Sequence, residues 1–421
     1  MRHILLLAAI LLVACDPYAD WPDPGDVFPY VFTPESNLQP FHTVRAETET
    51  WDPINDQDMA GLYLKKLLSQ KPSAPAEVLE HFRSVRPQIP ALGPGVRLSF
   101  VGDVMWVGGN WKAFAAPAGK LLDGDLRVGN LETPTSSDHP TDSMALGLWS
   151  FNAPTDMLEA LPLDLLQLNN NHSLDAGDKG LENTLREVAQ RGYRRTGVDQ
   201  QARVTVLGRE VALLAYTWGI NDRKVSKSHQ LHVIPFGHLD ESIDLGLLER
   251  QVSEARDAGA ELVVVLLHWG FEYEFYPEPH FMILARRIVS AGADLVVGQG
   301  PHVVQPAEIC HVNRPEVVPG VGTCSVRSGS GDRARTAAIL YSLGNFGTTM
   351  PTLQQKVGLV ATVSLDAGGV TGLGWSAAAS VPLEGGQEGV EVLPLSDLAP
   401  DAVYLDEQKR LEQHLGAGWK R

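Results

Sequence analysis

The sequence predicts an α/β fold, and two features lead to this prediction. Between about residue 96 and residue 365, short apolar runs of strand length alternate with segments of helical periodicity, which is the pattern of an α/β domain. Five of the apolar runs also end in a cluster of Asp, Glu, Asn or His side chains. Hairpin-like strands later in the chain favour a mixed sheet, or two sheets, over one parallel sheet.

The individual elements follow from local patterns. Helices are expected over 154–161, with Pro154 at the start, over 181–191, ended by Gly192, and over 245–258 and 281–291. Strands are expected over 98–101, 126–129, 163–168, 262–267, 295–297, 337–343 and 356–365, with a hairpin around Gly208 formed by 204–207 and 211–216. Shorter helical patterns span 58–68 and 76–85, and the tail from 401 to 415 is expected to form an exposed helix.

The beginning of the chain has the pattern of an export signal. Residues 4–13 are apolar but too short to span a bilayer, and they end just before Ala14-Cys15. This pattern resembles a bacterial lipobox, which implies cleavage before Cys15, acylation of Cys15 and anchoring in membrane lipid. The alternative is an ordinary signal peptide with a chance cysteine. We therefore expect an exported, lipid-anchored protein of the bacterial cell envelope.

The predicted organisation has four parts. A lipoprotein signal peptide spans 1–15, a linker and short helical segment spans 16–95, the main domain spans 96–400 and a C-terminal helix spans 401–421. Cys310 and Cys324 are the other two cysteines of the chain. Export favours a disulfide between them over two free thiols, with the residues between them as a surface excursion.

The composition limits the classes of partner. The 421 residues are 44% hydrophobic and 20% charged, which is typical of a folded globular protein, and the formal net charge is −17. Such an acidic chain is not expected to bind nucleic acid, which requires a basic surface. An anionic substrate would need a bound cation or a local basic pocket.

The side chains at the strand ends suggest a metal site. They are Asp103, Asn130 with Glu132, Asn171 and His172 with Asp175, His268, and His302. Each alone has an ordinary alternative, such as a turn cap, a solvated carboxylate or a hydrogen-bonded core histidine. Together they predict one site at the carboxyl edge of a sheet, where α/β folds place their sites. Their oxygen and imidazole donors suit a divalent ion.

The order of these clusters is similar to that of a known family. Residues 96–365 resemble the CapA family of poly-γ-glutamate capsule proteins, in the calcineurin-like metallophosphoesterase superfamily. The matching pieces are Gly102-Asp103-Val104-Met105, Asn130-Leu131-Glu132, Asn170-Asn171-His172 with Asp175, His268-Trp269-Gly270 with Glu272, Pro301-His302, and Tyr341 to Phe346 with Asn345. The resemblance implies a four-layer α/β/β/α sandwich.

The resemblance also implies roles for these residues. Asp103 and His302 would bind a first divalent metal (Mn, Fe or Zn), Asn171 and His268 a second, and Glu132 would bridge the two. His172, held by Asp175, would be the general acid or would orient the substrate. Asn130, Glu272 and Asn345 would line the site.

Position 300 departs from the family pattern. The block Gly-x-His-Pro-His is expected before Val303, but this chain has Gly298-Gln299-Gly300-Pro301-His302. Gly300 offers no side chain, so the second metal loses a ligand unless water, Gln299 or a neighbouring histidine replaces it. One ion, or a non-catalytic site, is therefore an open alternative to two.

Three functions remain open at this point. The first is synthesis, export or attachment of an anionic surface polymer of the poly-γ-glutamate type, with capsule-synthesis membrane proteins as further partners and a metal-dependent hydrolase or transferase site. The second is a secreted phosphoesterase acting on small esters or diesters, and the third is a non-catalytic accessory protein. Arginines at 314, 327, 333 and 335 are read first as a solvated loop and second as a basic lip for an acidic polymer.

Overall fold

The computed structural model describes residues 42–45, 50–53, 74–83, 92–106, 117–141, 150–221, 226–234, 243–319, 321–328, 333–383, 389–398 and 402–415. The strands are β1 (His42–Arg45), β2 (Thr50–Pro53), β3 (Val96–Val104), β4 (Leu126–Leu131), β5 (Leu165–Gln167), β6 (Arg194–Thr196), β7 (Ala202–Val206), β8 (Arg209–Thr217), β9 (Leu262–His268), β10 (Leu295–Gln299), β11 (Ala307–Val312), β12 (Thr323–Val326), β13 (Arg335–Leu340), β14 (Val357–Asp366), β15 (Gly369–Pro382) and β16 (Val390–Pro394). The α-helices are α4 (Ala76–Phe82), α7 (Gly177–Gln190), α8 (Gly246–Asp257), α9 (Pro279–Ala291), α10 (Leu353–Lys356) and α11 (Ala402–Leu415). Three 3₁₀ turns are η1 (Ala118–Leu121), η2 (Thr155–Ala160) and η4 (Leu395–Asp397).

The strands confirm the α/β class and the mixed sheet. Strands β3 to β16 form one 14-stranded sheet whose main path is β6-β5-β4-β3-β14-β15-β13-β10-β9-β8-β7. Parallel pairs such as β3–β4 and β9–β10 occur beside antiparallel pairs such as β14–β15. Strands β1 and β2 form a separate two-stranded sheet.

The four-layer sandwich expected from the family resemblance is not confirmed, because the strands form one curved sheet. The amide of Gln299 in β10 donates to the carbonyl oxygen of Val101 in β3 at 3.3 Å, although three strands separate β10 from β3 along the sheet. The sheet therefore bends round like a barrel. Its two halves are joined between β13 and β15 by a single residue pair, Thr336 with Gly369.

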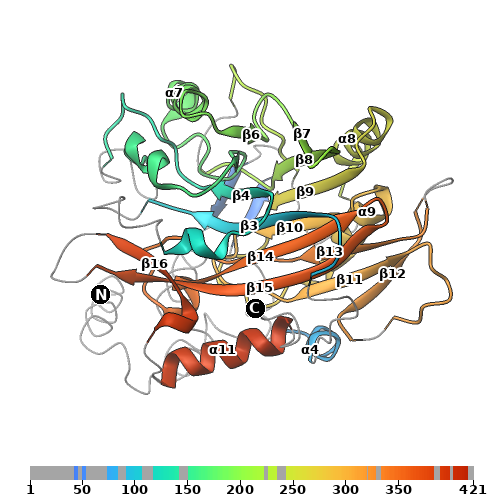
Figure 1. Ribbon diagram of the computed structural model, residues 1–421. Coiled ribbons are helices and arrows are strands. Elements are labelled where there is room, and N and C mark those ends of the chain that lie inside the picture. Colours follow the sequence, from blue (N-terminus) through green and yellow to red (C-terminus); the bar gives the residue numbers. More distant parts are fainter. Residues whose placement is uncertain are drawn as a thin grey trace.

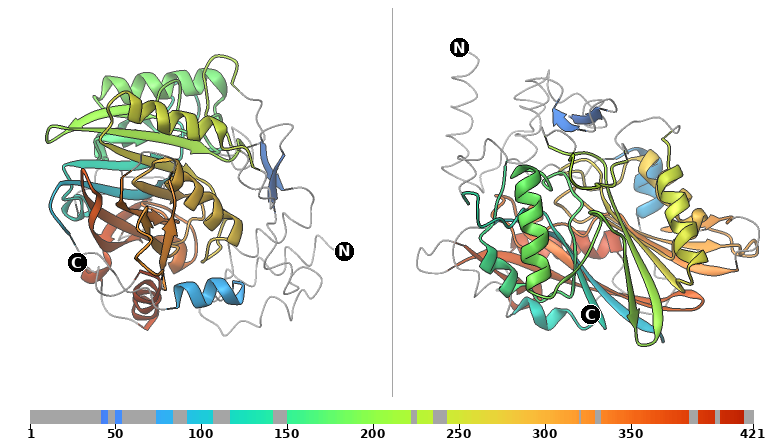
Figure 2. Two further views of the ribbon diagram at one scale, coloured as in Figure 1. Left: turned by 90° about the vertical axis from the view of Figure 1, so that its right-hand side faces the viewer. Right: turned by 90° about the horizontal axis from the view of Figure 1, so that it is seen from above.

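The helices lie on opposite sides of this curved sheet (Figure 1). Helices α7 and α8 lie at one side, beside β6 to β9, while α4 and α11 lie at the other, below β15 and β11. The views in Figure 2 agree with this division. The core strands β9 and β10 are buried along their whole length, as expected for apolar strands covered on both faces. None of the helices in the described ranges has the length and hydropathy of a membrane span.

Most sequence-predicted elements are present, with differences at their ends. The helix expected over 154–161 is the 3₁₀ turn η2, and the strand expected over 337–343 stops at Leu340. Strands β1, β2, β6, β11, β12, β15 and β16 were not predicted. The pattern over 58–68, the signal segment 1–15 and the site of acylation at Cys15 lie outside the described residues.

The prediction of an exposed C-terminal helix is wrong. In α11, Leu411 and Leu415 are buried, and so is His414. The guanidinium of Arg410 donates to the carbonyl oxygen of Val304 at 3.1 Å and lies 4.7 Å from the centre of the Phe275 ring. The helix is therefore packed against the loops that follow β9 and β10. The sequence showed only a sparse apolar face, which did not reveal this packing.

Candidate metal centre

The curvature of the sheet brings the strand-end residues together. Asp103 lies near the end of β3, Glu132 directly follows β4, His268 ends β9, and His302 follows β10. Because β3 pairs with β4 and β9 with β10, and β10 meets β3, four separate chain segments converge. All four side chains are at most 2% exposed.

A glycine allows the segment after β13 to approach Asp103. A Cβ at Gly102 would lie 1.7 Å from the carbonyl oxygen of Gly344, so no other residue fits there without moving the backbone. In this close approach the amide of Asp103 donates to Gly344 at 3.0 Å, and the amide of Phe346 donates to Asp103 at 2.7 Å. The Gly102-Asp103 pair thereby places Asn345 beside the centre.

Asp103 is fully hydrogen-bonded. Its Oδ1 accepts from Nδ2 of Asn130 at 2.7 Å, and its Oδ2 accepts from the backbone amide of Gly300 at 3.0 Å. Burial would raise the pKa of this carboxyl, but the contact with His302 and the facing imidazole of His268 outweigh burial, and the pKa is lowered. Asp103 is therefore a carboxylate that links the end of β3 to the ends of β4 and β10.

Glu132 has the opposite environment. Neither of its carboxyl oxygens accepts a hydrogen bond from any group in the described part of the chain, although both are buried. Burial, followed by the negative charge of Asp103, raises the pKa of Glu132 well above its ordinary value. A buried carboxyl without hydrogen bonds is costly, so this side chain calls for a cationic partner.

Two imidazoles face Glu132 and differ in charge. Oε1 of Glu132 lies 3.4 Å from Nε2 of His268 and 3.8 Å from Nε2 of His302. Burial lowers the pKa of His268 to about 3, so this ring is neutral. Burial would also lower the pKa of His302, but the charge of Glu132 and the contact with Asp103 raise it to about 10. Glu132 thus lies between a neutral ring and a cationic one.

Position 300 is a glycine that the backbone requires. Gly300 has φ +111°, and a Cβ there would lie 2.8 Å from the carbonyl oxygen of Trp269. A histidine at this position would be strained in this backbone. Gln299 does not replace it in any contact that the structure shows, because its amide is directed at Val101.

A second cluster contains the expected acid. Nδ1 of His172 lies 2.6 Å from Oδ2 of Asp175, which also accepts from the amide of Phe151 at 2.7 Å. The ring of Phe151 lies 4.4 Å from the His172 ring, centre to centre. Asp175 therefore fixes the orientation of His172, as the family resemblance implies.

Two further asparagines complete this region: Asn221, which the sequence patterns did not indicate, and Asn170, which the sequence indicated only as part of the family motif. Asn221 accepts from Nδ2 of Asn171 at 3.0 Å, and its own amide lies 3.3 Å from Nε2 of His172. Asn170 donates to Oδ1 of Asn130 at 3.0 Å. Asn221 follows β8, so the strand-end rule that found the other residues could have found it. Within the described residues, Oδ1 of Asn171 is buried without a hydrogen-bond partner.

The residues present fit a divalent ion. Ligand atoms of Asp103, Glu132 and His268 lie within 4.8 Å of one another and all three side chains are buried. The set combines carboxylate oxygen with imidazole nitrogen, the donors of zinc, iron and manganese sites. The unsatisfied carboxyl of Glu132 is the specific feature that a cation would stabilise.

A further group of metal-type residues is not a metal site. Glu308, Cys310 and Cys324 lie together, but the two cysteines form a disulfide, which leaves no thiolate to bind an ion. The carboxyl of Glu308 instead contacts His81, Arg286 and Tyr341 at 2.5 to 2.9 Å. This cluster fastens α4 to the sheet.

Both interpretations of the arginines near residue 330, the solvated loop and the basic lip, are wrong for Arg335. Arg335 is 1% exposed, donates to the carbonyl oxygen of Val289 at 2.7 Å and pairs with Asp294 at 3.3 Å. It is a core residue of β13 and cannot reach an acidic polymer. Val318, between the two cysteines, is 85% exposed, in line with a surface excursion there.

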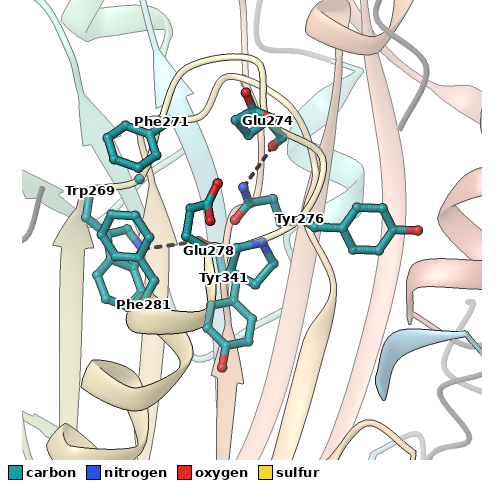
Figure 3. Close-up of a pocket in the computed structure, with 10 residues that line it drawn as sticks. Trp269, Phe271, Glu274, Tyr276, Glu278, Phe281 and Tyr341 are labelled. Carbon is teal, nitrogen blue, oxygen red and sulfur yellow. Dashed lines mark hydrogen bonds between the residues drawn. The ribbon is translucent and has the colours of Figure 1, made fainter. Parts of the chain in front are cut away.

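A small pocket lies beside the centre and contains none of its expected ligands. It is lined by aromatic residues of the loop after β9, including Trp269 and Phe271, with Phe281 of α9 and Tyr341. In Figure 3 the indole of Trp269 donates to the carbonyl oxygen of Tyr341, at 3.2 Å. Glu274 and Glu278 also line this pocket. Its walls pack the backbone next to His268, so we assign it a supporting role.

Comparisons with known proteins identify the family of this chain. The family model of bacterial capsule synthesis proteins (PGA_cap) matches residues 97–349, a range that includes every candidate ligand. PGA biosynthesis protein CapA of Bacillus subtilis is 28% identical over 232 residues, 53% of this chain and 53% of that protein. Capsule biosynthesis protein CapA of Bacillus anthracis is 31% identical over 192 residues, 43% of this chain and 39% of that protein.

A more distant relative is a probable polyglutamine synthesis accessory protein of Mycobacterium tuberculosis, 24% identical over 199 residues, which are 44% of this chain and 52% of that protein. The alignments thus span about half or less of the length of these relatives. A hypothetical protein from Thermus thermophilus aligns with 67% of this chain and 98% of its own, at 15% identity and a TM-score of 0.34.

Proposed function

We propose, on the premise that this chain belongs to the family of bacterial capsule synthesis proteins (PGA_cap), that it takes part in making, exporting or attaching an anionic polymer at the bacterial surface. Proteins named for PGA and capsule biosynthesis match its main domain. The poly-γ-glutamate type of polymer is carried over from these relatives. The net charge of −17 means that a cation at the site would help to receive such a polymer.

The observation that carries the proposal is the environment of Glu132. This carboxyl is fully buried and accepts no hydrogen bond from the described residues, and the cationic ring of His302 lies 3.8 Å away. A metal ion bound directly to Glu132 would therefore stabilise it. One or two ions of Mn, Fe or Zn would be held by Asp103, Glu132, His268 and His302. Asn171 would be a further ligand. A bound divalent ion would supply Lewis-acid activation for hydrolysis or transfer.

The protein's own groups would then handle protons and orientation. Nδ1 of His172 lies 2.6 Å from Oδ2 of Asp175. The other ring nitrogen, Nε2, is then left to hold a proton and to deliver it to a leaving group. Asn221 lies against the same ring and against Asn171, so it would keep the acid and the adjacent amide in register. Phe151 packs against the His172 ring and would limit access of water on that side.

The cellular setting is part of the proposal. Acylation at Cys15 would anchor the protein in membrane lipid, and residues 16–50 would hold the domain away from the membrane surface. The four-layer arrangement of the family has two facing sheets. It is compatible with the sheet of this protein, because the two halves of that sheet share only the pair Thr336 and Gly369 between β13 and β15.

A non-catalytic accessory role is the second candidate, because Gly300 lacks the family histidine and its backbone disfavours one. The two candidates are separated by a strain in which the gene is deleted. Surface polymer should be lost and should return with the wild-type gene. If the site is catalytic, Glu132→Ala should not restore the polymer, whereas the control Glu159→Ala, at a side chain 67% exposed, should.

Restoration by Glu132→Ala together with absence of bound metal in the purified wild-type protein would remove the catalytic proposal and leave the accessory one. Full polymer in the deletion strain would remove both.

A further inference from the structure

The two imidazoles that face Glu132 are held in opposite orientations by asparagine side chains. The amide of Asn345 is oriented by a backbone group, and that of Asn130 by Asn170, which itself bonds the backbone. These orientations define the proton position on each ring. This distinction rests on hydrogen-bond geometry alone.

Asn345 fixes His302. Nδ2 of Asn345 donates to the carbonyl oxygen of Gln355 at 2.8 Å, so Oδ1 is the atom turned toward His302. That oxygen lies 2.9 Å from Nδ1 of His302, and it can only accept. The ring therefore keeps a proton on Nδ1. Oδ2 of Asp103 is farther from Nδ1, at 3.4 Å, and already accepts from Gly300.

Two asparagines in series orient His268 so that its Nδ1 accepts a hydrogen bond, whereas Nδ1 of His302 donates one. Oδ1 of Asn170 accepts from the backbone amide of His172 at 3.1 Å, and its Nδ2 donates to Oδ1 of Asn130 at 3.0 Å. Asn130 therefore turns Nδ2 toward Nδ1 of His268, at 3.2 Å. In the neutral ring this nitrogen is the acceptor, so the proton lies on Nε2, the atom that faces Glu132.

The two rings consequently differ as ligands. When His302 is neutral, its lone pair lies on Nε2, which is 3.8 Å from Oε1 of Glu132 and 3.9 Å from Oε1 of Glu272. The side chain of Glu272 is 14% exposed, so this side of His302 leads toward solvent. His268 instead presents an N–H to Glu132.

We infer that Asn345 is a positioning residue that holds the Nδ1 proton of His302, so that Nε2 of His302, Glu132 and Glu272 form the principal face for a divalent ion. This inference deepens the proposed function and rests on it. It adds Glu272 as a ligand and makes His268 the lesser of the two histidines. It also agrees with the loss of a ligand at Gly300, on the His268 side, where a Cβ would lie 3.4 Å from Nε2 of His268.

The first test is a Zn²⁺ titration of the metal-free full-length protein by calorimetry. Removing a group that orients a ligand typically weakens metal affinity about 10- to 100-fold, and we expect this for Asn345→Leu. Glu272→Gln and His302→Gln should weaken binding at least as much, and His268→Gln less than His302→Gln. Asn152→Leu is the matched control, since Asn152 is a buried asparagine that bonds Ser136 away from the centre.

The second test needs no metal. Nitrogen-15 NMR of the histidine rings should show a slowly exchanging Nδ1 proton on His302 in the wild-type protein, and fast exchange in Asn345→Leu but not in Asn152→Leu. The inference is overturned if His302 lacks that proton, or if folded Asn345→Leu binds Zn²⁺ as tightly as wild type. If wild type binds no Zn²⁺, the metal face is wrong, and a protected Nδ1 proton would then show only that Asn345 orients the ring.

Discussion

Oε1 of Glu132 lies 3.4 Å from Nε2 of His268, while each oxygen of the neighbouring Asp103 carboxyl accepts a hydrogen bond from Asn130 or Gly300. Two buried carboxyls in one cluster thus have different tasks. Asp103 is hydrogen-bonded within the protein, holds the strand ends together and can offer an ion only its remaining lone pairs, whereas both oxygens of Glu132 are left for a ligand.

Glu132→Gln and Asp103→Asn should therefore change stability in different ways. In Asp103→Asn, the new amide N–H would face another N–H donor, that of Asn130 or Gly300. This loss of a hydrogen bond should lower the free energy of unfolding by about 1–3 kcal/mol. An amide at 132 removes a costly buried carboxyl, so the metal-free protein should be equally stable or more stable. Urea unfolding of both metal-free variants measures this. Equal destabilisation by the two changes would contradict the division of roles.

Restoring the family histidine at position 300 should not create a second metal site. The φ of +111° and the contact of a Cβ with Trp269 at 2.8 Å predict that Gly300→His costs at least about 1–3 kcal/mol. Thermal unfolding and zinc stoichiometry of Gly300→His and Gly300→Ala would check this, because Ala carries the same backbone penalty without an imidazole. A stable Gly300→His protein with one extra bound zinc would show that the backbone adapts.

Removal of the Arg410 side chain should loosen the centre from a distance. Arg410 ties α11 to Val304, two residues after His302, and to Phe275. Arg410→Ala should lower the unfolding free energy by about 1–3 kcal/mol and weaken Zn²⁺ binding. Lys409→Ala is the control, since Lys409 is 69% exposed and pairs with exposed Asp406, and it should change stability by less than about 0.5 kcal/mol. Unchanged zinc affinity in Arg410→Ala would limit α11 to a structural role.

The docking of α11 should weaken in mild acid. His414 contacts Arg410 through Nδ1 at 3.2 Å and the hydroxyl of Tyr276 through Nε2 at 3.1 Å. Burial, followed by the charge of Arg410, lowers the pKa of His414 well below 6.5. Below pH 6.5 the His414 ring therefore takes up a proton in the unfolded chain but stays neutral in the folded protein. The free energy of unfolding falls as the pH falls, by up to about 1.4 kcal/mol per pH unit.

His414→Gln removes this titration while it keeps a neutral donor and acceptor. The melting temperature of the wild-type protein should fall more between pH 7 and pH 5 than that of His414→Gln. Parallel decreases in both proteins would mean that His414 does not control the acid sensitivity.

The strand ends illustrate how far local patterns reach. The apolar run of β9 and its terminal His268 were visible in sequence, because a fully buried strand needs an unbroken apolar segment. Strand β15 was not, since its Gly- and Ala-rich stretch, including Gly372, Gly374 and Ala377 to Ala379, has no alternation of apolar and polar residues. Its identity depends on pairing with β14, which is a tertiary interaction.

Residue types and short spacings in the sequence were sufficient for the α/β class and for the candidate ligands at the strand ends. The missing side chain at position 300 and the pairing of His172 with Asp175 followed from matching the chain to the family motifs. Only the tertiary structure decided that one sheet curves until β10 meets β3, that α11 is buried, and that Asn345 and Asn130 orient the two imidazoles differently. These features depend on which surfaces meet across long separations in the chain, and hydrogen-bond direction becomes defined only when both partners are in place.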